Sequence, residues 1–526
     1  VRLDVPGATL RKEWPRFGYR IYRYATPLAP GAVTTIGFET RRAQKGFRNS
    51  GNEQRIVDNG TFVNNSEFAP AIGMTRTGLL TDRTKRRKYG LPSELRPPKL
   101  EDLAATRYNY IDRANWVNAD ITVTTDADQT PIAPGNRVSD VTANGRRTAH
   151  FVTEAPILHF FSVQSAHYEE KHLRHGKVDL VVYYDAKHPM NVDRMLKAMA
   201  AGLDYYEPNF APYQFRQARI IEFPGYEQFA QAFAGTMPYS EGIGFIADLS
   251  DPEKIDYPTY VTAHELGHQW WAHQEISADM QGGTMLVETL AQYSALMVME
   301  KLYGPDRIRR FLKYELDRYL RARGGEAIEE LPLYKVEDQG YIHYRKGSLV
   351  MYLLKDELGE AKVNAALRRF LTRYRFKGAP YPRSLDLIAE FRKEAATPAQ
   401  QALITDLFER ITLYDLKARD PKVTRRPDGK YDVTMVVDAK KLYADGKGVE
   451  RDTPLDEVMD IGLFSAMPGR GAFAAKDVIL FEKRPIRSGT QTLRFVTAKA
   501  PGFVGIDPYN KRIDRNSDDN VIATGF

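Results

Sequence analysis

The residues with the clearest chemical potential lie in the stretch 257–303, which contains the pattern H-E-x-x-H as His264, Glu265 and His268. Nineteen residues separate His268 from Glu288. Positions four apart on a helix lie on the same side, so both imidazoles can bind one Zn²⁺. Catalytic zinc commonly takes three protein ligands, and two histidines with one carboxylate form such a set. The spacing predicts His264, His268 and Glu288 as zinc ligands, with Glu265 beside them.

The pattern H-E-x-x-H also arises by chance in unrelated chains, so its surroundings must separate a metal site from coincidence. Trp270, Trp271 and the Met and Leu residues that follow Glu288 predict buried helices. Two histidines and two glutamates buried in such helices have little structural purpose unless a cation offsets the cost of removing them from water. The surroundings therefore favour a metal site.

Two predicted helices must position these side chains. Pro258 suits the first turn of a helix that runs through the histidines. A second helix is predicted over 284–303, because two glycines precede it and Gly304 with Pro305 forms a stop signal after it. Two antiparallel helices joined by a short loop can bring Glu288 back to the histidines.

Length and composition bound the class of protein. A chain of 526 residues is too long for one core and predicts about two to four domains. The absence of cysteine excludes disulfides and thiolate metal sites. The formal net charge is +7, but 75 basic residues are interspersed with 68 acidic ones, so we predict a mixed solvated surface and no nucleic-acid partner. No apolar run is long enough to span a bilayer.

Two other stretches could suggest additional sites. Arg83–Lys88 is the sharpest basic run, but no aromatic residue is interleaved with it to stack bases, so we predict an exposed loop. His167, His172 and His175 lie close together and could be taken for a second metal site. No carboxylate or cysteine completes a recognised spacing, and a polar turn before a strand over 177–184 is the preferred interpretation.

The spacing of apolar residues divides the chain into three parts. Residues 1–175 alternate apolar and polar residues between turn residues, which predicts a β-rich domain. Residues 176–416 show apolar residues three and four apart, which predicts a mainly helical domain that contains the metal site. Residues 417–526 return to alternation and fit a β-sandwich. The helices expected in the middle part, besides the two metal helices, cover 192–206, 306–323, 347–358, 361–374, 385–395 and 398–413.

The motif and this order of domains resemble the aminopeptidase N family of zinc metallopeptidases, which includes leukotriene hydrolase. The resemblance implies a multidomain α+β fold with an N-terminal β-saddle domain, a thermolysin-like and mainly helical catalytic domain, and a C-terminal β-sandwich. It also implies one Zn²⁺ per chain on the predicted ligands. Trp271 and Gln274 stand where metzincins need a glycine and a third histidine, so that class is excluded.

Two further segments match functional motifs of that family. Residues 237–242 (MPYSEG) stand at the position of Gly-x-Met-Glu-Asn, which implies that Glu241 binds the α-ammonium of the substrate. The asparagine of that motif is absent, and without the resemblance Glu241 could be an ordinary loop carboxylate. Residues 344–347 (YRKG) resemble Tyr-x-Lys-Gly, which implies that Tyr344 hydrogen-bonds the oxyanion. Without the resemblance, Tyr341 is an equal candidate.

Other details depart from the family pattern or stay open. Most members have one residue fewer between the second histidine and the glutamate, so an extra residue in the loop 281–283 is expected to keep the helix in phase. A second anchor for the N-terminus of the substrate usually comes from the β-rich domain, and Asn64 to Glu67 form a candidate loop. His273 is expected to shape the cleft without binding metal, and Glu275 is too near the histidines to be a ligand.

The longer spacing and the segment MPYSEGIGF also resemble a bacterial subgroup in which the peptidase is fused behind the membrane segments of a transporter permease. This resemblance implies a bacterial, extracytoplasmic soluble domain of a membrane protein, with permease segments of the same full-length protein as partners. The chain begins at Val1 without an initiator Met or signal peptide, which such an origin would explain.

The function implied by the resemblance is a zinc aminopeptidase that releases N-terminal residues from short peptides with a free N-terminus. Glu265 is the expected general base for water activated by zinc, and Tyr344 is the expected oxyanion donor. The alternatives are a gluzincin endopeptidase and a peptide-binding zinc module of a transporter without turnover. Intact Glu265 and Tyr344 argue against a pure binding module, which needs neither a base nor an oxyanion donor.

Overall fold

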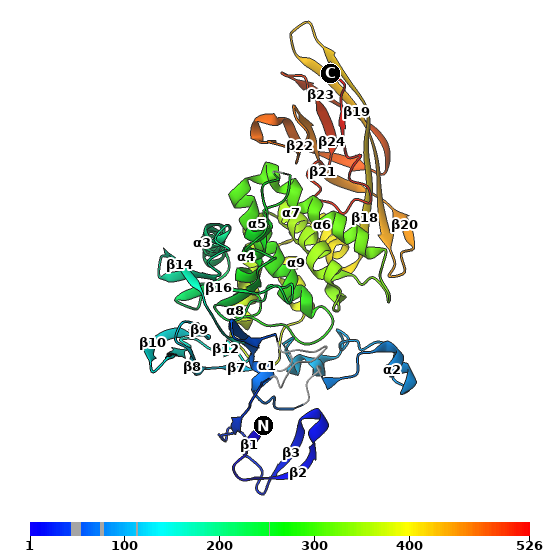
Figure 1. Cartoon of the computed structure of the whole chain (residues 1–526). Coiled ribbons are helices and arrows are strands. Elements are labelled where there is room, and N and C mark those ends of the chain that lie inside the picture. Colours follow the sequence, from blue (N-terminus) through cyan, green and yellow to red (C-terminus); the bar gives the residue numbers. More distant parts are fainter. Residues whose placement is uncertain (44–53, 74–77, 112–113, 252) are drawn as a thin grey trace.

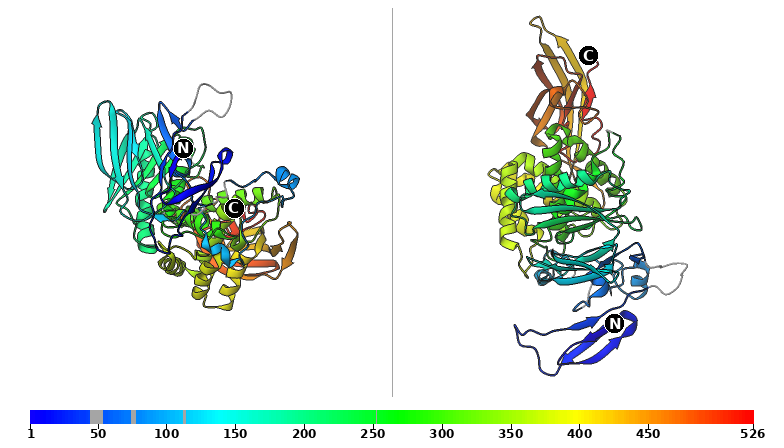
Figure 2. Two further views of the ribbon diagram at one scale, coloured as in Figure 1. Left: turned by 90° about the horizontal axis from the view of Figure 1, so that it is seen from below. Right: turned by 60° about the vertical axis from the view of Figure 1, so that its left-hand side comes forward.

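The structure is a computed structural model that describes residues 1–43, 54–73, 78–111, 114–251 and 253–526. A β-rich N-terminal region is followed by a mainly helical middle region and a C-terminal pair of β-sheets (Figure 1). The right-hand view of Figure 2 shows that these regions follow one another along the molecule, with the N-terminal strands at one end. The predicted fold class is confirmed at this level.

The N-terminal region is built from several small antiparallel sheets instead of one large sheet. Its paired strands are β1 (Arg2–Asp4) with β4 (Gly37–Glu39), β2 (Ala8–Trp14) with β3 (Tyr19–Tyr24), and β7 (Trp116–Val117) with β12 (Ile157–Leu158). One larger sheet has the strand order β5 (Ile56–Val57), β6 (Gly60–Asn64), β13 (Ser162–Ala166) and β9 (Thr130–Ile132). Another has the order β10 (Asn136–Ala143), β11 (Arg146–Val152) and β8 (Asp120–Asp126).

Two short helices interrupt this region, and both correct the sequence-based prediction. Arg83–Lys88, predicted as an exposed loop, is helix α2, because Asp82 caps it by accepting a hydrogen bond from the backbone N–H of Lys85 at 2.7 Å. Most of α2 is exposed, but Arg86 is buried. Asn65–Phe68, predicted as a loop, is helix α1.

A mixed sheet opens the middle region. Its strands are β14 (Glu169–His175), β15 (Val178–Tyr184), β16 (Gln217–Phe223) and β17 (Thr236–Ser240), and β15, β16 and β17 run parallel. Every residue of β16 is buried, as expected for a strand covered on both faces. The β14–β15 hairpin crosses the predicted domain boundary at 175/176, and the exact limits of the domains stay a prediction.

The histidine-rich segment before β15 is therefore a strand and not a polar turn. His172 contacts Asp179 at 3.1 Å, whereas His175 contacts Asp204 at 2.9 Å. His167 contacts Asp128 at 3.0 Å. The three imidazoles have separate carboxylate partners and do not converge on one point.

The helices of the middle region confirm most of the periodicity-based predictions. They are α3 (Val192–Asn209), α4 (Tyr257–Gly267), α5 (Leu290–Tyr303), α6 (Ile308–Arg323), α7 (Gly347–Leu358), α8 (Glu360–Tyr374), α9 (Ser384–Glu394) and α10 (Pro398–Ile404). All residues from Leu290 to Met299 are buried, so α5 is the central helix of the core. The predicted end at 413 is wrong, because a π-helical turn over Thr405–Glu409 leads into strand β18, which starts at Ile411.

Two packed sheets form the C-terminal region. One contains β18 (Ile411–Arg425), β19 (Tyr431–Ala444), β20 (Glu450–Thr453) and β23 (Gly489–Thr497), and the other contains β22 (Val478–Arg487), β21 (Asp456–Phe464), β24 (Phe503–Ile506) and β25 (Val521–Ala523). Leu416 and Val437 of the first sheet share a buried cluster with Ile461 and Ile506 of the second. This arrangement is a β-sandwich.

Buried ion pairs fix the sandwich to the helices. Lys441 of β19 lies 2.5 Å from the carboxylate of Asp406, which belongs to the π-helical turn before β18. Lys511 lies 2.6 Å from Asp356 of α7 and 2.8 Å from Asp460 of β21. Paired burial lowers the desolvation cost of these charges, and loss of one partner would leave the other charge uncompensated.

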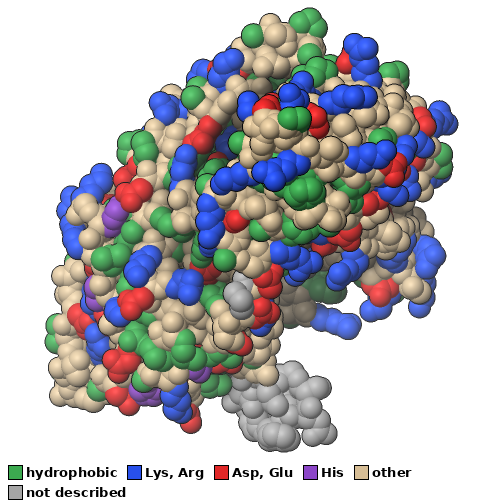
Figure 3. All heavy atoms as spheres, turned by 90° about the horizontal axis from the view of Figure 1, so that it is seen from above, with side chains coloured by type: hydrophobic (Ala, Val, Ile, Leu, Met, Phe, Trp, Pro, Cys, Tyr) green, Lys and Arg blue, Asp and Glu red, His purple; other side chains and the backbone are tan. Residues whose placement is uncertain are grey.

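The outer surface agrees with the charge balance of the sequence. On the face seen from above, Lys and Arg side chains are interspersed with Asp and Glu (Figure 3). Within the described residues, no helix combines the length and the apolar character that a membrane crossing requires.

Glu275 is a buried charge-bearing group without compensation. Its side chain is 0% exposed, and in the described part of the chain neither carboxylate oxygen has a hydrogen-bond partner. Burial raises the pKa of Glu275 well above its ordinary range. The side chain is therefore held in its neutral acid form.

We predict that Glu275→Gln gains stability relative to the wild type as the pH rises from about 5 to 8. The folded pKa of Glu275 lies above its unfolded value of about 4.3, so its contribution to stability is full below that value and is lost as the pH rises through the folded pKa. Glutamine has the same shape and does not ionise. Unfolding midpoints measured across this pH range check the effect.

Glu169→Gln provides the matched control, because Glu169 is exposed. Its pH profile should run parallel to that of the wild type. Parallel profiles for Glu275→Gln and the wild type would contradict the neutral buried state.

Candidate metal centre

Helix α4 begins with a strong local signal. The Asp256 carboxylate accepts hydrogen bonds from the Thr259 backbone N–H at 3.2 Å and from the Thr259 hydroxyl at 2.7 Å. Pro258 occupies the first turn, where a missing N–H costs nothing. The helix ends at Gly267, and His268 keeps right-handed helical angles as its C-cap. This geometry places His264 and His268 one turn apart.

The side chains of His264, His268 and Glu288 converge. The two Nε2 atoms lie 3.0 Å apart, and Glu288 Oε2 lies 3.5 Å from His264 Nε2 and 3.3 Å from His268 Nε2. His264 and His268 are buried, and Glu288 is partly buried. The structure thus brings together the three residues that the sequence predicts as ligands.

This triangle fits a zinc ion. Tetrahedral zinc with bonds of about 2.0–2.1 Å needs donor atoms about 3.3 Å apart. Glu288 Oε2 is buried and has no hydrogen-bond partner in the described residues, as expected of an atom that binds a cation. The donor set also suits zinc, because imidazole and carboxylate are common ligands of this ion.

The protonation of the cluster reflects mutual electrostatics. Burial lowers the pKa of His268, but the Glu288 and Glu265 carboxylates outweigh burial and raise it to about 9. Burial raises the pKa of Glu288, but the two imidazoles outweigh burial and lower it well below its usual range. The carboxylate of Glu288 is therefore held ionised, as a ligand must be.

Glu265 lies beside the cluster, in a position to exchange a proton. Burial raises its pKa, whereas the two imidazoles and a hydrogen bond from the Ala232 amide oppose that rise, and Glu288 adds to it. The side chain is only 6% exposed. A buried carboxylate with a raised pKa can hold and release a proton nearer neutral pH than an exposed one.

Glu288 lies in a π-helical turn over Met285–Thr289 that leads into α5. A π turn holds one residue more than an α turn, and such turns are frequent at functional sites. The turn therefore supplies one extra residue just before α5, and the place of this chain's additional residue relative to the family, expected in the loop 281–283, stays a prediction. The phase of the buried face of α5 is preserved.

A second π-helical turn, Tyr341–Lys346, precedes α7 and carries Tyr344. The ring of Tyr344 lies 5.8 Å from the imidazole of His264, and the Glu288 carboxylate is close enough to act on its hydroxyl. Burial and the nearby carboxylates raise the pKa of Tyr344 above its usual value, so the phenol keeps its proton. Tyr341 points elsewhere, because its hydroxyl donates to Glu326 at 2.8 Å.

The π-helical turns Met285–Thr289 and Tyr341–Lys346 contact each other. The Thr289 hydroxyl donates a hydrogen bond to the His343 carbonyl at 2.6 Å. A Cβ atom at Gly347 would lie 2.4 Å from Thr289 Oγ1, which is closer than real contacts allow. Glycine at position 347 therefore permits the approach that brings Tyr344 to Glu288.

A neighbouring backbone carbonyl orients the imidazole of His268. His268 Nδ1 donates to the Trp271 carbonyl at 3.0 Å, which leaves Nε2 free to bind metal. The Trp271 indole N–H in turn donates to the Ser294 hydroxyl of α5 at 2.9 Å. These partners come from the tertiary packing, and the sequence pattern gave no means to name them.

The segment 229–233 forms the edge that borders the site, and sequence reasoning missed it. It pairs with β17 through Ser240 N–H to Phe229 O at 3.0 Å and Gln231 N–H to Pro238 O at 3.1 Å. In this antiparallel pattern the backbone groups of Ala230 point away from β17. The Ala232 N–H reaches Glu265, and its carbonyl accepts a hydrogen bond from His273 Nε2 at 3.0 Å.

His273 supports this edge and lies outside the ligand cluster. Burial lowers its pKa to about 4, so the imidazole is neutral. It is 1% exposed. The expectation that His273 shapes the cleft agrees with its hydrogen bond to Ala232.

Glu241 belongs to a different group. Its carboxylate accepts a hydrogen bond from the Gly225 N–H at 2.9 Å, and it lies near His188 and Glu222. These three residues border a cavity of about 210 Å³ next to the N-terminal strands. The predicted role of Glu241 in binding the substrate ammonium stays a prediction.

The segment 64–67, the candidate second anchor for the N-terminus of the substrate, is engaged in contacts with other parts of the chain. Glu67 forms ion pairs with Arg42 at 2.7 Å and with Arg55, and it caps α1 through the Asn64 N–H at 2.9 Å. The Asn65 side chain bonds the His159 carbonyl and the Phe161 N–H. These contacts give the segment a structural purpose.

Comparison with known proteins adds independent information. Residues 194–407 match the model described as Peptidase family M1 domain. Endoplasmic reticulum aminopeptidase 2 from Homo sapiens is 26% identical over 192 residues, which are 35% of this chain and 20% of that protein. This chain therefore spans about a fifth of the length of the human relative.

Solved structures give a more distant likeness. An M1 zinc metallopeptidase from Deinococcus radiodurans, and a variant of it bound to a Tyr-Ser-Ala substrate, are each 18% identical with a TM-score of 0.44. The likeness covers 56% of this chain and 65% of theirs.

The matched family segment contains the ligand cluster, Glu265 and Tyr344. The order of regions and the geometry of this centre agree with that match. Residues 194–407, which hold this centre, therefore match a peptidase family M1 domain.

Proposed function

We propose that this chain is a zinc-dependent aminopeptidase that releases N-terminal residues from short peptides. The observation that carries the proposal is the convergence of His264, His268 and Glu288, with donor atoms no more than 3.5 Å apart. Glu265 and Tyr344 border the same cluster. A binding module would need the ligands but neither of the other two side chains.

Each side chain has a distinct task. His264, His268 and Glu288 would hold one zinc ion, which when bound supplies Lewis acidity and makes water acidic enough to lose a proton near neutral pH. Glu265 accepts that proton on its carboxylate and returns it to the leaving amine. Tyr344, which stays protonated, donates its O–H to the oxygen on which negative charge develops.

The edge at 229–233 offers a place for the peptide backbone. The amide and carbonyl of Ala230 face away from β17, and Ala232 directly contacts Glu265. An extended peptide can add to such an edge by main-chain hydrogen bonds. This pairing would align a scissile bond with Glu265.

Glu241 decides between two modes of cleavage. A carboxylate that binds a free ammonium favours an aminopeptidase. In this structure Glu241 is engaged by the Gly225 N–H and lies near His188 and Glu222, which favours a weaker hold on the substrate N-terminus. A gluzincin that also cleaves internal bonds is therefore the second candidate function. An extracytoplasmic location and permease segments as partners stay predictions.

Hydrolysis of an aminoacyl fluorogenic amide, compared with its N-acetylated form, tests the proposal. We expect the wild type to cut the free-amine compound only, and a chelator to abolish the activity. Glu265→Gln should lower kcat by a factor of about 100 to 10,000 while zinc content stays unchanged, because Glu265 moves a proton and does not bind metal.

Equal cleavage of both compounds would favour the endopeptidase. A zinc-loaded protein that cuts neither compound nor any longer peptide, across a panel of first residues, would overturn the proposal. Glu275→Gln is a control for the loss of a buried carboxylate, and it should keep its activity.

The oxyanion role of Tyr344 generates a separate prediction. Tyr344→Phe should lower kcat by about 100-fold to 1,000-fold with little change in KM, because the hydrogen bond forms with charge that develops in the transition state. Steady-state kinetics on the same amide measure this. Tyr341→Phe is the matched control, since its hydroxyl bonds Glu326 instead. Similar losses in both variants would contradict the assignment.

A further inference from the structure

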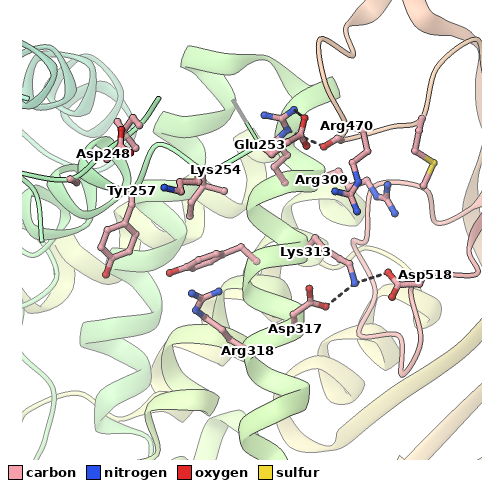
Figure 4. A pocket seen from close by; sticks show the side chains of 17 residues that line it. Asp248, Glu253, Lys254, Tyr257, Arg309, Lys313, Asp317, Arg318, Arg470 and Asp518 are labelled. Atoms are coloured by element: carbon pink, nitrogen blue, oxygen red, sulfur yellow. Dashed lines mark hydrogen bonds and ion pairs between the residues drawn. The ribbon is translucent and has the colours of Figure 1, made fainter. Parts of the chain in front are cut away.

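A second large cavity lies between the helical region and the C-terminal sandwich. It has a volume of about 580 Å³, a size suited to several side chains of a ligand. One wall is a single face of α6, another is formed by residues 247–249 and 253–257 before and at the start of α4, and the third is formed by C-terminal loops (Figure 4). Its charged side chains are Asp248, Glu253, Lys254, Arg309, Arg310, Lys313, Asp317, Arg318, Arg470 and Asp518.

Several of these charges neutralise one another. Lys313 lies 2.8 Å from Asp317 and 3.0 Å from Asp518 (Figure 4). Arg310 lies 3.5 Å from Glu253. Arg309 is buried, and its Nε donates to the Asn510 side chain at 2.8 Å. These groups hold the walls of the cavity together.

Three cations are left over. Within the described residues, no carboxylate lies within ion-pair distance of Lys254, Arg318 or Arg470. The guanidinium of Arg318 stacks on the ring of Tyr314, 3.4 Å from its centroid, so its donor edges remain available. Asp248 is the one remaining lining carboxylate; it accepts a hydrogen bond from the Ser250 N–H at 2.9 Å, and the charge of Lys254 acts on it without forming an ion pair. The cavity therefore carries surplus positive charge.

The cavity borders the metal centre through aromatic side chains. Tyr257 lines it and is the first residue of α4. Burial raises the pKa of Tyr257, and the charges of Arg345, Glu315 and Glu265 also act on it, in decreasing order. The phenol therefore lies near Glu265, the proposed general base. The ring of Tyr257 lies 6.4 Å from that of Tyr314.

The distance between the metal centre and the cavity matches the length of a short extended peptide. His264 follows Tyr257 by seven residues along α4, which corresponds to about 10 Å at 1.5 Å per residue. An extended peptide covers about 10 Å with three residues, at about 3.3 Å each. A peptide cut after its first residue would thus bring its fourth and fifth residues to the cavity.

We propose that this cavity binds carboxylates of the peptide downstream of the scissile bond, at about the fourth and fifth residues. Lys254, Arg318 and Arg470 are the recognising groups, and the ligand class is a short peptide with acidic side chains or a free C-terminal carboxylate at that distance. The inference rests on the proposed peptidase function for the direction of the peptide, but the cavity can be tested by binding alone.

Calorimetry on the full, zinc-loaded Glu265→Gln chain tests binding without turnover. The probes are Ala-Ala-Ala-Glu-Glu, the same peptide with Gln-Gln and a C-terminal amide, and a C-terminally amidated peptide with Glu-Glu moved to positions two and three. We expect the first probe to bind about fivefold to tenfold tighter than the others at low salt, and the difference to shrink as salt screens the exposed charges.

Adding Arg318→Gln and Arg470→Gln together should remove that preference. Arg321→Gln is the matched control, because it removes one charge from the same helix outside the cavity lining. Retained preference in the double variant, or equal binding of all three probes, would overturn the proposal.

Peptide cleavage by the wild type separates the two hypotheses. If the wild type cuts the neutral peptide but shows no gain in kcat/KM for the acidic one, the cavity proposal falls and the peptidase stands. If no peptide is cut but the acidic probe binds through Arg318 and Arg470, the peptidase proposal falls and the cavity stands.

Discussion

Two imidazoles and a carboxylate within 3.5 Å of one another, all largely removed from water, form the constraint on which this structure depends. Such a group costs free energy unless a cation replaces the lost hydration. Glu288 Oε2 has no other partner in the described residues, and His268 uses its second nitrogen for the Trp271 carbonyl. Zinc would therefore contribute to folding as well as to catalysis, because its binding free energy is available only to the assembled cluster.

The rest of the middle region serves to keep this cluster in place. Helix α5 is buried from Leu290 to Met299 and follows the turn that carries Glu288. Helix α4 carries His264, and Trp271 beyond its end is tied to α5 through Ser294. The edge at 229–233 reaches Glu265 from the sheet side. Buried ion pairs such as Lys511 with Asp356 hold the sandwich against the same helices, so the cavity beside α6 keeps its walls. Rigid elements thus supply every group that borders the centre.

Local patterns in the sequence were sufficient for the parts of the site that depend on one helix. Positions 264 and 268 are neighbours on any helix, and the stop at Gly304 follows from the sequence alone. The direction of Glu241 could not be predicted, because it depends on the Gly225 N–H and on His188, which other segments bring in. The choice of Tyr344 over Tyr341 required the π turn, whose extra residue leaves no periodic signal. The edge at 229–233 is defined by a partner strand and not by its own residues.

The contact between Thr289 and Gly347 links the two sides of the centre. One residue belongs to the turn that presents Glu288, and the other ends the turn that presents Tyr344. A side chain at 347 would collide with Thr289, so the distance between the metal ligand and the phenol is set by how small this pair is. Redesign of the site must therefore treat positions 289 and 347 together: a larger residue at 347 requires a smaller one at 289, whereas a larger residue at 289 has no compensation, because 347 is already glycine.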